Sequence, residues 1–175
     1  MNVLLVGDIV GRPGRTAFTK IVSQLRDSGQ VDFVIANAEN SASGRGPTPE
    51  IANAILDAGA DVIILGDHAW DSKEMVEGID LEERIIRPAN FSKQVPGKGW
   101  IRVDTPFGKI VVMQFIGRVF MQPNQLCPFE HVICFQLHPT HMNVAHQLLQ
   151  NQPPHLDALE GSEEKLLYHQ PMKLI

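Results

Sequence analysis

Short apolar runs, each followed by polar residues, recur along the first part of this 175-residue chain. The runs at residues 3–6, 31–36 and 62–65 contain few polar positions and many β-branched side chains. Runs of this length and composition are typical of strands that are buried on both faces. They therefore predict three central strands of one sheet.

Two stretches between these runs have the periodicity of helices. After a predicted turn at 11–14, apolar residues recur at helical spacing over 18–25, and Gly29 is suited to end the helix. Thr48 and Pro49 are suited to the N-cap and the first turn of a second helix. The alternation of strands and helices predicts a parallel sheet with right-handed crossovers, and hence an α/β fold.

The elements that follow are predicted to end in antiparallel rather than parallel strands. Asp71 or Ser72 caps a short predicted helix, and residues 84–87 are predicted to form a short strand. Residues 99–104 and 109–116 are rich in apolar side chains and are separated by a turn-forming sequence. This pair is predicted to form an antiparallel hairpin.

The composition changes abruptly after Met121. Six of the seven histidines and both cysteines lie beyond this residue, but only two of the fifteen basic residues do. We expect a core at residues 1–121 and a divergent tail at 122–175, which belongs to the same domain or is poorly ordered. Within the tail, 132–137 is the candidate strand and 156–169 the candidate helix.

The overall composition, 43% hydrophobic and 20% charged, is that of an ordinary globular domain. A net charge of −5 excludes a generic attraction to nucleic acid backbones or anionic membranes. The amino-terminal residues lack the basic region and the apolar length of a signal peptide or a membrane span, so we expect a cytoplasmic protein. Cys127 and Cys134 match no zinc-site spacing and are expected to be reduced, packing thiols.

Side chains with metal-binding oxygens follow all three central strands. Asp8 follows the first strand, Glu39 and Asn40 follow the second, and Asp67 follows the third. Because the carboxyl ends of parallel strands lie at one edge of a sheet, these four residues are expected to converge. Oxygen-rich clusters of this kind suit divalent cations. The alternative for each residue is that it caps the helix or turn that follows it.

A proton donor and a phosphate site are the other candidate features. His68 comes directly after Asp67 and is placed to give a proton to a leaving oxygen; the alternative is a histidine that is only hydrogen-bonded. Gly7, Gly11 and Gly14 resemble a phosphate loop but fit neither common spacing of such loops. Three arginines are candidate phosphate contacts, with solvated surface positions as the alternative: Arg12, Arg45 and Arg118.

Seven motifs occur in order along the chain. They are residues 7–15 (GDIVGRPGR), 37–40 (NAEN), 44–46 (GRG), 66–71 (GDHAWD), 87–91 (RPANF), 96–99 (PGKG) and 117–121 (GRVFM). Together these motifs resemble the bacterial YmdB-like metallophosphoesterases, and the resemblance extends from the amino terminus to about Met121.

The resemblance implies a calcineurin-like αββα sandwich, a centre of two divalent metal ions, iron or manganese, and phosphodiesterase activity on 2',3'-cyclic nucleotides. It makes Asp8, Glu39, Asn40 and Asp67 metal ligands, with Glu39 bridging the ions, and His68 the catalytic proton donor. Two metals would clamp the phosphate and activate a water for in-line attack. The implied partner is a small cyclic nucleotide or another phosphodiester, with no role for a membrane.

The chain departs from the family pattern in two respects. The family has Asn where this chain has Asp67, and the added negative charge is expected to raise the pKa of His68 and to lower activity. The family's His-Ala-Glu and Gly-Thr-His-Thr-His motifs, which complete the metal centre, are missing. His138 and His141 in the tail are the candidate substitutes.

These departures predict a partial sandwich whose second half is truncated or altered, through a truncation or a shift of reading frame. The sheet that faces the first is then expected to be largely missing, and uncovered apolar strand faces favour a homo-oligomer. Three functions follow. They are a metal-dependent phosphodiesterase of reduced or lost activity, a non-catalytic metal- or nucleotide-binding remnant, and an unrelated doubly wound nucleotide-binding protein.

Overall fold

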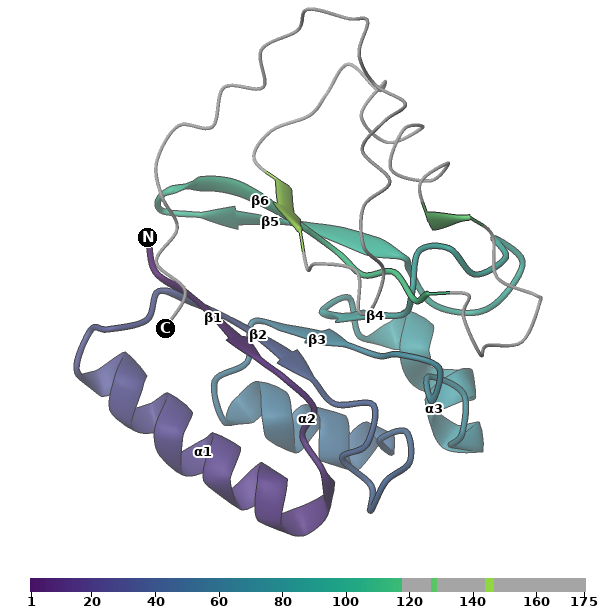
Figure 1. Ribbon diagram of the computed structural model, residues 1–175, viewed down its shortest axis with the longest axis horizontal. Coiled ribbons are helices and arrows are strands. Elements are labelled where there is room, and N and C mark those ends of the chain that lie inside the picture. Colours follow the sequence, from purple (N-terminus) through teal and green to yellow (C-terminus); the bar gives the residue numbers. More distant parts are fainter. Residues whose placement is uncertain (118–126, 129–143, 147–175) are drawn as a thin grey trace, which may run out of the picture.

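The computed structural model describes residues 1–117, 127–128 and 144–146 of the chain. Its first sheet contains four parallel strands in the order β1-β2-β3-β4. These strands are β1 (Val3–Val6), β2 (Phe33–Asn37), β3 (Val62–Ile64) and β4 (Ile85–Ile86). Two helices, α1 (Gly11–Asp27) and α2 (Pro49–Asp57), lie against one face of this sheet (Figure 1).

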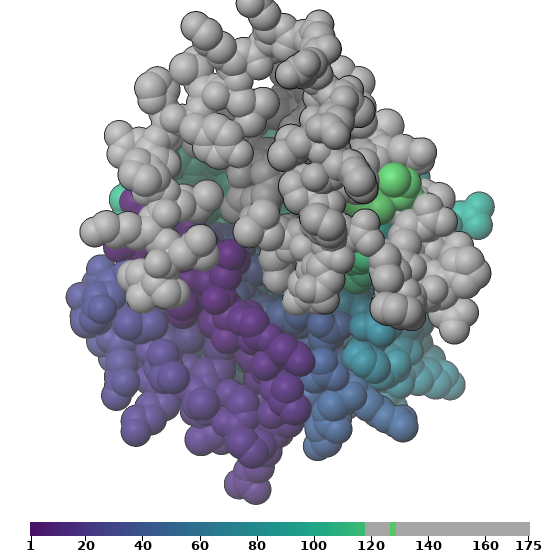
Figure 2. Space-filling model, in the orientation of Figure 1, coloured from purple at the N-terminus to yellow at the C-terminus, as the bar shows by residue number. Residues whose placement is uncertain are grey.

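A second, smaller sheet lies over the opposite face of the first (Figure 1). β5 (Trp100–Thr105) and β6 (Gly108–Met113) form an antiparallel hairpin, and β7 (Val144–His146) pairs with β6 in parallel. α3 (Lys73–Gly78) and the 3-10 helix η1 (Ile79–Leu81) connect β3 to β4. The space-filling view in the same orientation shows α1, in purple and violet, on the lower surface of the molecule (Figure 2).

Two apolar layers hold these elements together. Along β2, Val34 and Ala36 face the layer between the helices and the first sheet, whereas Phe33 and Ile35 face the layer between the two sheets. Both faces of the central strands are thus covered, which explains why nearly every position in the runs is apolar. The second layer consists of Val3, Phe33, Ile35, Val62, Ile64, Ile86, Ile110 and Val112.

The expectation that the facing sheet is largely missing is wrong. The hairpin of β5 and β6 supplies that layer, since Ile110 and Val112 pack directly on the first sheet. The residues of β3 that face the hairpin, Val62 and Ile64, are 0% and 2% exposed. An apolar hairpin therefore suffices to cover the central strands.

The predicted alternation of elements is confirmed, and so are two helix starts. The Thr48 hydroxyl accepts a hydrogen bond from the Ile51 amide, and the Ser72 hydroxyl accepts one from the Met75 amide, which are the N-caps of α2 and α3. The predicted turn at 11–14 is wrong, because α1 begins at residue 11 itself. The predicted elements at 132–137 and 156–169 lie outside the described residues.

The loop after β4 is tied to the segment that follows β6. The Asn90 side chain donates to the Ile116 carbonyl at 2.9 Å and accepts from the Ile116 amide at 3.0 Å. The Ala89 amide donates to the Gln114 carbonyl at 2.7 Å. These bonds join the two sheets at one end of the sandwich.

None of the helices in the described part of the chain combines the length and the apolar content that crossing a bilayer requires.

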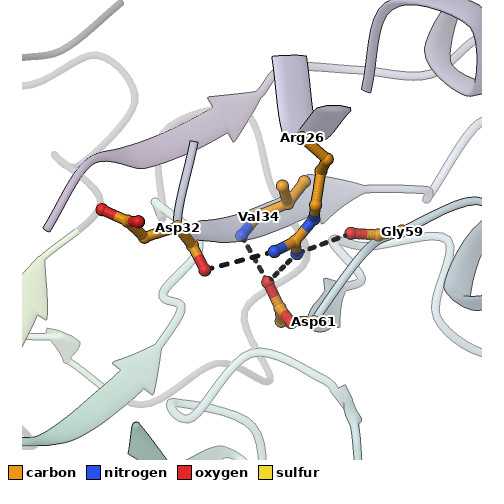
Figure 3. Close-up of polar contacts among 5 residues, drawn as sticks. All are labelled: Arg26, Asp32, Val34, Gly59 and Asp61. Carbon is orange, nitrogen blue, oxygen red and sulfur yellow. Dashed lines mark hydrogen bonds and ion pairs between the residues drawn. The ribbon is translucent and has the colours of Figure 1, made fainter. Parts of the chain in front are cut away.

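At the amino-terminal edge of the first sheet, Arg26 links three elements (Figure 3). Its guanidinium donates to the carbonyls of Asp32, at 3.2 Å, and Gly59, at 2.9 Å, and forms an ion pair with Asp61. The Asp61 carboxylate also accepts the Val34 amide at 2.7 Å. The network thus fastens α1 to the starts of β2 and β3.

We expect the Arg26→Ala substitution to lower the free energy of unfolding by about 1–2 kcal/mol, because it removes charged hydrogen bonds to partly buried acceptors. Lys20→Ala, at an exposed position of the same helix, should change it by less than about 0.5 kcal/mol. Urea denaturation followed by circular dichroism measures both values. Equal midpoints for the two variants would contradict this role of Arg26.

Candidate metal and phosphoester site

The carboxyl ends of β1, β2 and β3 are joined by backbone hydrogen bonds. The Ile9 amide donates to the Asn37 carbonyl at 2.9 Å, and the Ala38 amide donates to the Ile64 carbonyl at 3.1 Å. The Gly11 amide donates to the Asn40 carbonyl at 3.0 Å. The residues that follow the three strands are therefore held at one edge of the sheet, as the sequence predicts.

Asp8 and Asn40 are in direct contact at this edge. The Asn40 amide nitrogen lies 2.9 Å and 3.0 Å from the two carboxylate oxygens of Asp8. The N-cap of α1 is Val10, and no side chain caps that helix. Asp8 therefore does not cap α1, and its carboxylate is turned toward the end of β2.

Glu39 occupies the space that a side chain at residue 66 would fill. A Cβ atom built on Gly66 would lie 1.7 Å from Glu39 Oε2 and 2.4 Å from its carboxyl carbon. Asn37 also holds this carboxylate, since the side-chain amide nitrogen of Asn37 donates to Glu39 Oε1 at 2.9 Å. The backbone amide of Glu39 in turn donates to Asn37 Oδ1 at 3.0 Å. The Glu39 carboxylate is therefore fixed over the end of β3.

The charges around Glu39 are not balanced. Burial raises the pKa of the Glu39 carboxyl, and the negative charges of Asp67 and Asp8 raise it further, against the hydrogen bond from Asn37, which lowers it. Of these two acids, Asp67 has the larger effect on the Glu39 pKa. Neighbouring carboxylates are stabilised by a proton or a cation between them.

The donor chemistry of this edge fits a hard or borderline divalent cation, since the contacting atoms are carboxylate and amide oxygens. In residues 1–117, 127–128 and 144–146, however, no group of three or more His, Cys, Asp and Glu side chains is arranged closely enough to hold a metal ion. The structure joins Asn40 to Asp8 by a hydrogen bond and places the Glu39 carboxylate against Gly66, the residue before Asp67. A complete two-metal ligand set is not present in this part of the chain.

His68 lies beside this group and is oriented by Asp71. Its Nδ1 atom lies 2.8 Å from a carboxylate oxygen of Asp71, so Nε2 is the ring nitrogen left for another partner. Burial acts to lower the pKa of His68, but the contact with Asp71 and the charges of Asp67 and Glu39 outweigh it, so the net shift is upward. The expected upward effect of Asp67 on the pKa of His68 is confirmed.

The loop after β2 packs behind His68. A Cβ atom on Gly46 would lie 2.0 Å from the His68 carbonyl oxygen and 3.5 Å from the Asp71 Cβ atom. Arg15 of α1 donates to the carbonyl of Ser41 at the start of the same loop. The backbone of His68 is therefore enclosed by a loop that α1 holds in place.

The other candidate residues are not part of this group. Arg12 and Arg45 are exposed, and the structure gives neither a contact with the carboxylates. Cys127 is a free thiol, in agreement with the sequence. Arg118, Cys134, His138 and His141 lie outside the described residues.

Sequence reasoning assigned no role to Asn37 or Gly66, and it did not predict that Asp71 orients His68. Asn37 ends a strand of apolar residues and is only 2% exposed, and a buried amide at such a position requires a partner. Asp71 lies three residues after His68, a spacing that brings side chains together in a helical turn. Gly66 carries no such signal, because its importance depends on Glu39, which is distant in sequence.

A parallel sheet covered by helices on one face and by a second sheet on the other, with acidic residues at the strand ends, is the architecture of the calcineurin-like phosphoesterases. The profile of the YmdB-like protein family matches residues 4–145, and the chain belongs to this family. The predicted family and the α/β fold class are therefore confirmed. The match also extends past residue 121, where the predicted core ends.

Individual relatives agree with this assignment. A 2',3'-cyclic-nucleotide 2'-phosphodiesterase of Bacillus subtilis is 39% identical over 123 residues, which are 70% of this chain and 47% of that protein. A crystal structure of a hypothetical protein from Thermus thermophilus superposes with a TM-score of 0.71 at 36% identity, covering 77% of this chain and 52% of that one. A crystal structure of a phosphatase from Mycoplasma pneumoniae superposes with a TM-score of 0.69 at 26% identity. The superposition covers 75% of this chain and 48% of that one. The chain spans about half the length of this Bacillus subtilis relative.

We expect the Gly66→Ala substitution to weaken Mn²⁺ binding by about tenfold or more, as loss of support for a metal ligand does, because the new methyl group displaces the Glu39 carboxylate. The fold should persist, since the clash is with the end of a flexible side chain. Gly7→Ala is the matched control, because a Cβ atom at Gly7 meets nothing within 4 Å. Isothermal titration calorimetry that finds equal affinities for the two variants would refute this role of Gly66.

Proposed function

We propose that this chain is a metal-dependent phosphodiesterase that hydrolyses 2',3'-cyclic nucleotides. The observation that carries the proposal is the position of the Glu39 carboxylate, which Asn37 holds against Gly66 at the end of β3, directly before Asp67 in the sequence. Neighbouring carboxylates are unfavourable without a cation or a proton, and phosphoester chemistry uses cations in this position. The name of the Bacillus subtilis relative supports the choice of substrate.

In this proposal Asp8, Glu39, Asn40 and Asp67 would hold the divalent ions, iron or manganese. When bound, the ions supply charge for the phosphate oxygens and a water of lowered pKa. Asn40 orients the Asp8 carboxylate through its amide nitrogen, and its amide oxygen is the atom available as a ligand.

His68 acts as the proton donor to the leaving oxygen. Its Nδ1 atom is held by Asp71, so the proton is delivered from Nε2. Asp71 fixes the orientation of the His68 ring. It also favours the protonated form of the ring, because its contact raises the pKa of His68. The extra carboxylate of Asp67 favours the same form but repels the anionic substrate, which lowers turnover.

A non-catalytic metal- or nucleotide-binding protein is the second candidate function. It is favoured by one observation, namely that the described residues contain no group of three acidic, histidine or cysteine side chains able to hold an ion. A site of this kind would bind one cation weakly and would not align a water with the phosphate. The doubly wound alternative is excluded by the family assignment.

An assay of the purified chain with 2',3'-cyclic AMP and Mn²⁺ distinguishes the two candidates. We expect turnover that falls by about 100-fold or more in Glu39→Gln, since even partners of metal ligands contribute about 10–100-fold. Gly7→Ala should retain wild-type activity, which controls for changes near the strand ends. Turnover no higher than that of Glu39→Gln would refute the enzyme and favour the binding function.

We expect the Asp67→Asn variant to turn over the cyclic nucleotide faster than the wild type at saturating Mn²⁺, because it removes a negative charge that faces the phosphodiester. Asp71→Asn is the matched control: it makes the same chemical change beside His68 but removes the group that orients the ring, so its activity should fall. The measurement is kcat for each variant. A kcat of Asp67→Asn at or below the wild-type value would show that Asp67 does not limit turnover.

A further inference from the structure

Among the residues that the structure describes, β5 is the outermost strand of the second sheet. Its only partner strand in the described part of the chain is β6, and the sheet order is β5-β6-β7. The backbone donors and acceptors on the outer edge of such a strand are a template for pairing with another strand.

The side chains of β5 alternate between the two faces of the sheet. Ile101 and Val103 face the layer between the sheets but are only half-buried, whereas Ile110 and Val112, opposite them on β6, are 4% and 2% exposed. The apolar layer is therefore incompletely covered along β5. On the opposite face of β5, Arg102 and Asp104 are exposed.

We propose that two copies of this chain pair through β5, as antiparallel strands related by a two-fold axis at Val103. In this register Arg102 lies opposite the partner's Asp104, and Asp104 lies opposite the partner's Arg102. Both cross-strand pairs are of opposite charge, which stabilises antiparallel neighbours. The inference is independent of the proposed activity, since it uses no residue of the metal site.

The charges select this register over its neighbours. An axis at Arg102 would place the two copies of that arginine against each other, and an axis at Asp104 would do the same with two carboxylates. A shift by one residue would bring the exposed face of one strand next to the inner face of the other. Asp104 also lies opposite Lys109 within its own hairpin, so pairing places the carboxylate between two basic residues.

The inner face of β5 fits the same arrangement. Val103 meets the partner's Val103 at the axis, and Ile101 meets the partner's Thr105. The two second sheets then form one continuous sheet, and the apolar layer that is incompletely covered along β5 continues into the partner. An unrelated extended peptide would form the same backbone hydrogen bonds, but a copy of β5 also offers both charges in the matching order.

Charge reversal tests the pairing. Sedimentation velocity over a range of concentrations should show a dimer for the wild type, and Arg102→Asp and Asp104→Arg should each raise its dissociation constant by about tenfold, since each creates two like-charge pairs. The double variant with both changes restores opposite charges and should recover the dimer. Lys20→Asp, on the outer surface of α1, should leave the dissociation constant unchanged. A monomeric wild type, or a double variant as weak as the single ones, would overturn the proposal.

Disulfide trapping tests the position of the axis. In a background with Cys127 and Cys134 changed to Ser, the Val103→Cys variant should form a covalent dimer on mild oxidation, because paired strands hold opposed Cα atoms about 4.5–5.5 Å apart, within disulfide range. Thr105→Cys is the control, since its two copies would be displaced along the strands by about 13 Å. Equal cross-linking of the two variants, or cross-linking of Thr105→Cys alone, would refute the register.

Discussion

The parallel register of β1, β2 and β3 is the constraint on which the site depends. Each strand can be apolar only as far as it is covered on both faces, so the first polar residues appear where the strands leave the sandwich. Because the strands run in one direction, these polar residues lie at the same edge of the sheet. The backbone hydrogen bonds that the Ile9 and Ala38 amides donate hold the three strand ends together. The covered sheet thus determines where acidic side chains can gather, and the loops determine how closely they approach.

Acidic side chains are neutralised at one edge of the first sheet but not at the other. At the amino-terminal edge, the carboxylate of Asp61 is neutralised by Arg26 and accepts a backbone amide. At the carboxyl-terminal edge, the pKa of Glu39 is raised by burial and by its acidic neighbours, Asp67 and Asp8. Uncompensated negative charge is therefore concentrated at the carboxyl-terminal edge, while the opposite edge contributes to stability.

Much of this structure could be predicted from the sequence, because its signals are local. The caps at Thr48 and Ser72, the apolar runs and the turn of the hairpin depend on neighbours within a few residues. The placement of Asp8 and Glu39 at one edge follows from strand direction alone. The insertion of the Glu39 carboxylate at Gly66 could not be predicted, since it depends on the distance between two loops, and the covering of β3 by the hairpin depends on packing between sheets.

The Arg26 network also bears on the order in which the chain assembles. Its longest sequence separation, from Arg26 to Asp61, is 35 residues, and the bond from Val34 to Asp61 spans 27. Loops of this length close at low entropic cost, so every partner is available once β3 has left the ribosomal exit tunnel. On the ribosome, the unit from β1 to β3 can be fastened while the hairpin of β5 and β6 is still inside the exit tunnel, and the second sheet then docks onto strands whose ends are already aligned.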